Sequence, residues 1–434
     1  MTAAETERAS EADEARRYDV LVVGGGPAGL SAAEAVAKGG ARVALLERQK
    51  EIGYPVHTSG GSWIADMQAL GIPADLYHPI RSVTFLSPQA EARFDYPDPV
   101  CCVLDVRGVY QHIAARAVAA GAELHPNSPV ERPIVEDGRV LGVVAKDHRN
   151  RLGEWRAPVV IDASGFSCTL STRANLHAGY RRYGYGAEYD LYAPNYDPES
   201  LYLIMGSQVA PAGYAWAFPR GKGRVRLGVG VIRPDVDVDA REYLDSFAQR
   251  LPSLAPVFAR ASPIEYHTGL FPSEGVVPRF VGDGLLATGD AAGHGSTLVG
   301  EGIRFAIYSG QMAGVVAAEA VRAGDASAQF LERYERQWRA RFGREMEISY
   351  IVNQRIAAWT DEQWDDGVAM LRRLTAAQAA ELLRGDYSVP LFLGVLRRNP
   401  RLLRTGARKF FDLAFQRLGR SQPVTEADVA GSGA

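Results

Sequence analysis

Residues 24–29 read Gly-Gly-Gly-Pro-Ala-Gly and have the GxGxxG spacing of a dinucleotide-binding turn. The turn follows the apolar run 18–23 and opens the alanine-rich segment 30–38, whose composition favours a helix. Such glycines allow a tight turn, a close approach of the backbone to a pyrophosphate and close packing of helix on strand, and the helix N-terminus attracts phosphate. The positions predicted to bind the nucleotide are Gly24, Gly26, Pro27, Ala28 and Gly29.

A carboxylate stands where the ribose of the nucleotide is expected. The next apolar strand, 41–46, is followed by Glu47 and Arg48, about 20 residues beyond the glycine-rich turn. Glu47 would accept hydrogen bonds from the adenosine ribose hydroxyls, and Arg48 is expected beside it at the nucleotide. Together these parts predict a βαβ unit that binds the ADP half of a dinucleotide.

Later segments decide which dinucleotide it is. Residues 287–293, Ala-Thr-Gly-Asp-Ala-Ala-Gly, resemble the second flavin fingerprint of the FAD-dependent hydroxylase and reductase superfamily, and 162–165, Asp-Ala-Ser-Gly, resemble its middle motif. The resemblance implies FAD as the cofactor, with Asp290 on the ribityl chain. A helix starting after Gly300 and Gly302 would place its N-terminus at the N1–C2=O edge of the flavin, where reduced flavin is negative. Further expected contacts are Arg107, Val130, Asp162, Gly289 and Ile303.

The chain also resembles the geranylgeranyl reductase family, flavoenzymes that saturate prenyl double bonds, over about residues 18–418. Its most specific segment is 211–219, Pro-Ala-Gly-Tyr-Ala-Trp-Ala-Phe-Pro, which is similar to the family's YxWxFP motif. Tyr214, Trp216 and Phe218 alternate, so on a strand they share one face. They could form an apolar, substrate-binding wall for an isoprenoid tail, or they could be ordinary aromatic residues of a sheet core.

The chemistry implied by this resemblance is hydride transfer from reduced flavin to one alkene carbon and proton transfer to the other. The polar side chains expected near the flavin, and hence the catalytic candidates, are His57, Ser59 and His294. A histidine has an unperturbed pKa of about 6.5, which suits proton transfer near neutral pH, although either could instead bond to backbone. Ser59 stands where the family often has cysteine, and 293–298 lacks the usual Asn-Pro, so substrate or reaction could differ.

These elements predict an α/β protein with a glutathione-reductase-type Rossmann FAD domain, an inserted antiparallel-sheet substrate domain and a C-terminal helical region. The expected FAD domain is discontinuous. It comprises 18–54, 98–170 and 279–325; the substrate and catalytic domain comprises 55–97 and 171–278; the helical region is 326–420; disordered tails occupy 1–17 and 421–434.

The composition limits the classes of partner. The net charge of −3 argues against nucleic acid, and three cysteines without a CxxC pair argue against a disulfide framework or a metal site. No apolar stretch is long enough to span a bilayer, so the sequence predicts a cytoplasmic protein. The basic and aromatic segment 397–420 could rest on the inner face of the membrane, or it could be a packed helix with a solvated basic face.

The electron donor and one alternative reaction stay open. No second GxGxxG occurs in a strand–turn–helix context, so the donor would be transiently docked NAD(P)H, ferredoxin or another reductase. An FAD-dependent monooxygenase of a lipophilic or aromatic natural product shares the same FAD segments. The absence of lysine between Lys50 and Lys146 argues against a flavin halogenase, and the few cysteines argue against an iron–sulfur quinone reductase. The remaining hypothesis is a non-enzymatic binding module in which FAD stabilises the protein but never turns over.

Overall fold

The computed structural model describes residues 16–250 and 254–398. One half of it is built on a parallel sheet with a single antiparallel edge strand, in the order β18-β19-β12-β1-β2-β8. Its four central strands are short, largely apolar and buried, as expected of a sheet covered on both faces. The strands of the whole sheet are β1 (Val20–Val23), β2 (Val43–Leu46), β8 (Glu123–His125), β12 (Val159–Asp162), β18 (Val281–Gly282) and β19 (Leu285–Ala287).

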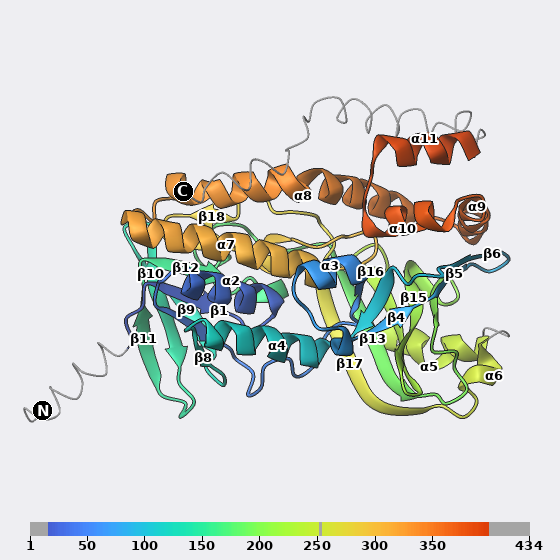
Figure 1. Ribbon diagram of the computed structural model, residues 1–434, viewed down its shortest axis with the longest axis horizontal. Helices are drawn as coiled ribbons and strands as arrows, with labels where there is room; N and C mark the ends of the chain where they lie inside the picture. The colour runs from blue at the N-terminus through green and yellow to red at the C-terminus, as the bar shows by residue number, and fades with distance from the viewer. Residues whose placement is uncertain (1–15, 251–253, 399–434) are drawn as a thin grey trace, which may run out of the picture.

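Alternate residues of these strands face two different layers. Val20 and Val22 pack under α2 (Pro27–Lys38), α4 (Val106–Ala119) and α7 (Ile303–Ala323), while Leu21 and Val23 pack on a three-stranded sheet, β9–β11. Figure 1 shows the three helices together on one side of the sheet. The strands of the second layer are β9 (Val130–Glu136), β10 (Arg139–Lys146) and β11 (Leu152–Arg156). This three-layer arrangement is the predicted Rossmann architecture.

The other half is a seven-stranded sheet, mostly antiparallel, in the order β17-β13-β16-β15-β14-β5-β6. One face packs on α5 (Ala240–Arg250) and α6 (Ala255–Phe258), and the opposite face turns toward the C-terminal helices (Figure 1). The strands are β5 (Ser82–Leu86), β6 (Glu91–Asp95), β13 (Tyr183–Tyr192), β14 (Ser200–Gly206), β15 (Ala210–Gly221), β16 (Arg224–Arg233) and β17 (Ser262–Pro272). A small sheet joins the halves: β3 (Gly61–Trp63), β4 (Tyr77–Ile80) and β7 (Cys101–Leu104).

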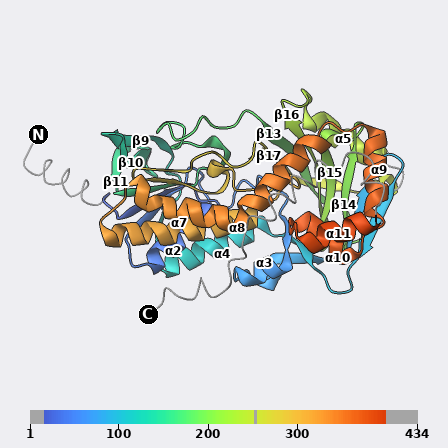
Figure 2. The same ribbon diagram turned by 90° about the horizontal axis from the view of Figure 1, so that it is seen from above.

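The C-terminal part is helical, with α8 (Ala328–Ile356), α9 (Asp361–Leu371), α10 (Ala376–Arg384) and α11 (Val389–Arg398). Figure 2 shows α8 running along α7 and the three shorter helices gathered over the seven-stranded sheet. The helices α9 and α10 each begin with a capping box, at Thr360 and Thr375, which satisfies free N–H groups of the first turn. Among the described helices, none combines the length and apolarity needed to cross a bilayer.

Buried ion pairs fasten α10 over the junction of the two halves. The guanidinium of Arg384 lies 3.0 Å from Asp66 on α3 (Ile64–Ala69), and its backbone oxygen accepts a hydrogen bond from Arg304 on α7. Arg304 also pairs with Glu301 and with Glu345 of α8. Burial raises the pKa of Glu345 to about 8, even though the charge of Arg304 opposes the shift. The helical region is thereby held against the start of α7.

Candidate active site

The glycine-rich turn has the geometry that a pyrophosphate requires. Gly24 has φ +110°, and a Cβ there would lie 2.2 Å from the oxygen of Ala163; a Cβ on Gly29 would lie 1.9 Å from the oxygen of Gly24. Both positions therefore demand glycine to let β1, β12 and α2 approach one another. A Cβ on Gly26 would meet no atom within 4 Å. Gly26 thus opens onto free space at the α2 N-terminus, where phosphate is attracted.

The residues predicted at the adenosine end gather beside β2. The carboxylate of Glu47 accepts hydrogen bonds from the backbone N–H groups of Gly25 and Gln49, which shapes the turn. Arg107 pairs with Glu51 through an exposed ion pair, and Arg48 is exposed. The backbone N–H of Ser128 bonds to the oxygen of Glu47, which brings the start of β9, and so Val130, alongside. The predicted ribose contact of Glu47 stays a prediction.

The carboxylate of Asp162 is engaged within its own loop. Its side chain is fully buried, and its oxygens accept hydrogen bonds from the backbone and hydroxyl of both Ser164 and Ser171 and from the N–H of Leu170. The carboxylate of Asp162 therefore holds its own loop, and the predicted contact of Asp162 with FAD stays a prediction. The neighbours Ala163 and Gly165 are the ones that line the cavity described below.

The predicted flavin end comprises Asp290 and the beginning of α7. Within the described part of the chain, no side chain or N–H donates a hydrogen bond to the Asp290 carboxyl, and burial raises its pKa to about 6. Gly289 has φ +62°, which turns the chain here, and Gly302 caps α7 without any side-chain bond to its free N–H groups. The buried carboxyl of Asp290 could accept hydrogen bonds from the hydroxyls of a ribityl chain. The free N–H groups at the start of α7 suit the N1–C2=O edge of a flavin.

A cavity of about 580 Å³ starts at these residues and runs over the seven-stranded sheet to the C-terminal helices. Its far end is apolar, with Val352, Ile356, Leu371, Leu382, Leu391 and Phe392 among its walls. The predicted positions that line it are Gly26, Pro27, Ala28, His57, Ser59, Tyr214, Trp216, Gly289, Asp290, Gly300, Gly302 and Ile303. The predicted positions that do not line it are Gly24, Gly29, Glu47, Arg48, Arg107, Val130, Asp162, Phe218 and His294.

The predicted aromatic row is present on β15, but only part of it reaches the cavity. The rings of Tyr214 and Trp216 are 5.6 Å apart, and those of Trp216 and Phe218 are 6.2 Å apart. Phe218 does not form part of the cavity wall, because its ring packs against Gly61. The substrate-binding role predicted for Phe218 is therefore corrected to packing of the 60–63 segment.

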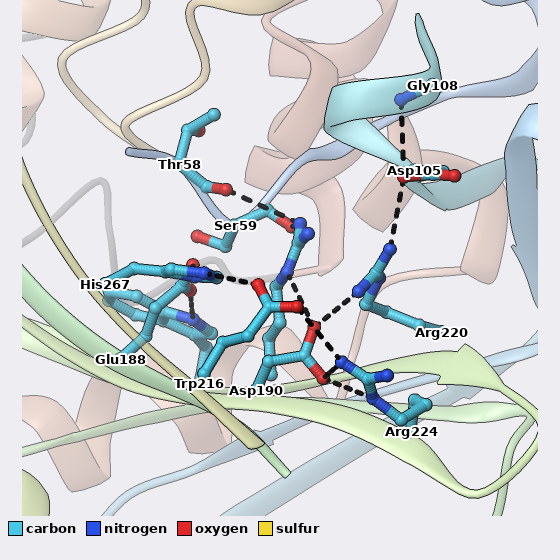
Figure 3. Close-up of polar contacts among 12 residues, drawn as sticks. Thr58, Ser59, Asp105, Gly108, Glu188, Asp190, Trp216, Arg220, Arg224 and His267 are labelled. Carbon is cyan, nitrogen blue, oxygen red and sulfur yellow. Dashed lines mark hydrogen bonds and ion pairs between the residues drawn. The ribbon is translucent and has the colours of Figure 1, made fainter. Parts of the chain in front are cut away.

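The polar loop 57–59 lies at the cavity as predicted from the sequence. Nδ1 of the exposed His57 is 3.0 Å from the oxygen of Thr268. The loop is held from below, because the buried guanidinium of Arg226 donates to the backbone oxygen of Ser59 over 2.6 Å. Figure 3 shows Thr58 and Ser59, which accept these contacts from Arg226 through their backbone oxygens. Whether His57 or Ser59 takes part in the chemistry stays a prediction.

Sequence reasoning missed three ionisable residues of the cavity wall. Glu188, His267 and Glu301 all line it, and all are buried. Glu301 is engaged by Arg304 and accepts hydrogen bonds from Ser62 and Trp63. Glu188 and His267 touch each other although they lie 79 residues apart in the chain (Figure 3). One signal in the sequence points to this pair. Glu188 follows Gly186 by two residues, so both lie on the same face of a strand, where a glycine leaves space beside the carboxylate.

His294 does not lie at the cavity. It is fully buried, its ring stacks on Trp338 at 3.9 Å, and the edge of Phe280 meets it at 4.7 Å. Burial, with a smaller effect from the charge of Arg339, holds its pKa well below the usual value. A neutral imidazole enclosed in an aromatic core cannot exchange protons with a substrate. The catalytic role predicted for His294 is therefore corrected to core packing.

This correction predicts a pH dependence of stability. The unfolded chain binds a proton at His294 below about pH 6.5, whereas the folded chain does not, so stability is lost as pH falls below that value, by up to ~1.4 kcal/mol per pH unit. We expect His294→Leu to remove this part of the slope in urea titrations between pH 7.5 and 5.5. The exposed His148 provides the control, and an unchanged slope in His294→Leu would contradict the assignment.

The site and the two halves of the fold define an FAD-dependent oxidoreductase, since Gly26, Asp290 and the α7 N-terminus each fit a part of FAD. A family model for FAD-dependent oxidoreductases matches residues 19–180, and one for the geranylgeranyl reductase catalytic domain matches 183–270. The chain belongs to the geranylgeranyl reductase family.

Individual relatives cover nearly the whole chain. Digeranylgeranylglycerophospholipid reductase 2 of Methanothermobacter thermautotrophicus is 34% identical, over 88% of this chain and 99% of the relative. The protein of the same name from Methanopyrus kandleri is 31% identical, over 89% and 98%. Among solved structures, a geranylgeranyl bacteriochlorophyll reductase-like protein from Thermoplasma acidophilum superimposes with a TM-score of 0.80 at 28% identity, covering 90% of this chain and 98% of that one.

Proposed function

We propose that this enzyme saturates carbon–carbon double bonds in the geranylgeranyl chains of a glycerophospholipid. The observation that carries the proposal is a continuous cavity that begins at Asp290 and the N-terminus of α7 and ends among apolar side chains of α8–α11. A cavity of this size and character suits a lipophilic ligand, because ligand pockets are mostly apolar with a few polar groups at one end. The names of the relatives supply the class of lipid.

The protein's part in this reaction is to bind, orient and keep out water. Reduced FAD supplies a hydride when bound. The flat faces of Tyr214 and Trp216 would hold the reacting alkene, while aliphatic residues such as Leu371 and Leu382 would hold the rest of the isoprenoid chain. An isolated alkene has no carbonyl to stabilise charge, so exclusion of water and a positioned acid matter more than in the reduction of an enone.

The test is an anaerobic single turnover. FAD-loaded protein is reduced with dithionite, mixed without oxygen with digeranylgeranyl glycerophospholipid in detergent, and followed by flavin absorbance and product mass. We expect reoxidation of the flavin and a gain of two hydrogens for each bond reduced. Reoxidation only after oxygen is admitted, with insertion of one oxygen atom into the substrate, would show a monooxygenase instead.

We further propose an external electron donor and a peripheral contact with membrane. The donor would be NAD(P)H, ferredoxin or another reductase.

A lipid substrate must be taken from a bilayer, and α11 exposes Leu393 and Val389 beside Arg397 and Arg398 at its end. Most of the predicted basic segment 397–420 lies outside the described residues. Co-sedimentation with anionic vesicles, compared with neutral vesicles, would test this contact.

A further inference from the structure

Four neighbouring strands of the seven-stranded sheet place one row of residues at the bottom of the cavity. The backbone register pairs His267 of β17 with Glu188 of β13, Glu188 with Gly228 of β16, and Gly228 with Trp216 of β15. Residues directly opposite each other on neighbouring strands point to the same face. The side chains of His267, Glu188 and Trp216 therefore meet on the face that lines the cavity, as Figure 3 shows.

The row is connected by hydrogen bonds from the cavity to the protein surface. The indole Nε1–H of Trp216 donates to Oε2 of Glu188 over 3.1 Å, and Nδ1 of His267 lies 3.1 Å from Oε1 of the same carboxyl. Nε2 of His267 lies 3.0 Å from Glu265, whose side chain is 44% exposed. The imidazole thus bridges a carboxyl at the cavity and a carboxyl in contact with water.

The missing side chain of Gly228 makes the first of these bonds possible. A Cβ at this position would lie 2.3 Å from Cε2 of Trp216, so the indole lies directly over the glycine backbone and reaches the next strand. Gly230 and Gly186 lie under the same ring, where a Cβ would be 3.3 and 3.6 Å from it. The indole ring packs flat against the backbone of these three glycines, which fixes its orientation beside Glu188.

The charges around His267 favour its protonated form. Burial and the positive charge of Arg226 act against protonation, but the hydrogen bond to Glu188, the charge of Glu188 and the hydrogen bond to Glu265 raise the pKa of His267 above the usual value. Arg226 is itself paired with Asp190, and Arg224 lies between Asp190 and Glu265. The imidazolium of His267, held between the carboxylates of Glu188 and Glu265, can supply one proton next to the cavity.

We propose that Glu188 is the acid that protonates the alkene and that His267 returns the proton to Glu188 from water through Glu265. This inference rests on the proposed function. In the resting state Glu188 is a carboxylate beside the His267 imidazolium, which gives its Nδ1 proton to Oε1 of Glu188. The carboxyl of Glu188 then gives H⁺ to one alkene carbon and is again a carboxylate, and the hydride that bound reduced FAD would supply completes the second C–H bond. The neutral imidazole of His267 regains a proton at Nε2 from water through Glu265, so the alkene gains H⁺ and H⁻ in total and the pair returns to its starting state.

Other acids at the cavity are less suited to this step. Both oxygens of Glu301 are engaged by Arg304 and also accept from Ser62 and Trp63, so this carboxyl is held by fixed partners even though burial raises its pKa. His57 is exposed and its Nδ1 lies at the oxygen of Thr268. Glu188 differs from both, because its protonated partner is buried and its route to water is defined.

Glu188→Gln is the variant that tests the path, because an amide keeps an acceptor for Trp216 but cannot release a proton. In the anaerobic single turnover we expect reoxidation at least ~100-fold slower, the range of a lost general acid, with unchanged FAD content and lipid affinity. Glu188→Asp should recover part of the rate.

His267→Gln should slow reoxidation and remove the fall in rate that the wild type shows as pH rises through the pKa of His267. Asp95→Asn, on the exposed edge of the same sheet, is the control.

A second measurement does not depend on turnover. In FAD-loaded protein with ¹⁵N-histidine, the signal missing from His267→Gln identifies His267, which should titrate above 6.5 in the wild type and lower in Glu188→Gln. A wild type that fails to reoxidise with the lipid would remove the proposed function, and the proton path with it. A wild type that reoxidises while Glu188→Gln keeps pace, or a His267 that titrates below 6.5, would overturn the proton path alone.

Discussion

Replacing Trp216 with alanine is expected to weaken the binding of a geranylgeranyl lipid by ~100-fold and to leave FAD bound. The indole is a large apolar surface of the cavity wall, and aromatic residues in such positions carry ~2 kcal/mol or more of binding free energy. It lies outside the set of positions that fit FAD. The measurement is the affinity of the oxidised protein for the lipid, with the FAD content determined from the visible spectrum.

Two matched variants separate the contributions of Trp216. Trp216→Phe keeps an aromatic surface but loses the hydrogen bond to Glu188, so lipid affinity should change little while turnover falls. Phe218→Leu alters the same row outside the cavity and should affect the melting temperature more than lipid affinity. Equal lipid affinity in Trp216→Ala and wild type would refute the assignment of this wall.

The second large effect is expected at Gly26, where an added methyl group should block the cofactor without disturbing the fold. Gly26 has φ −78° and ψ −179°, which alanine adopts readily, and its Cβ would meet no protein atom. The pyrophosphate needs that space. We expect Gly26→Ala to lower FAD affinity by at least ~100-fold, or ~2.8 kcal/mol, as measured by titrating apoprotein with FAD.

The contrast with Gly29→Ala makes this test specific. A Cβ on Gly29 would lie 1.9 Å from the oxygen of Gly24, so this variant should lose stability even in the apoprotein. Gly26→Ala should melt near the temperature of the wild-type apoprotein. If Gly26→Ala bound FAD as tightly as the wild type, the cofactor would have to lie elsewhere.

Much of the FAD site could be predicted because its signals are short and local. A turn such as 24–29 follows its strand and opens its helix within a few residues, so its conformation and its ligand are encoded together. The same holds for Gly289 and Asp290 before α7. The aromatic alternation on β15 was local as well, since side chains two residues apart on a strand share a face.

The errors arose where a residue's neighbours come from distant segments. His294 follows a flavin motif directly, yet Phe280 and Trp338 enclose it, and neither is near it in sequence. Phe218 shares a face with Trp216, but the small sheet that carries Gly61 covers it.

Contiguous patterns in the chain were enough to predict the FAD-binding architecture, the reductase family and the strand that carries the aromatic wall. Which of these side chains reach the cavity, and which acid lies there, depends on how distant segments pack together. Glu188 and His267 become partners through the register of β13 with β17, and Trp216 reaches Glu188 because Gly228 lies between them. Strand register is set by the packing of whole sheets, which no local pattern specifies.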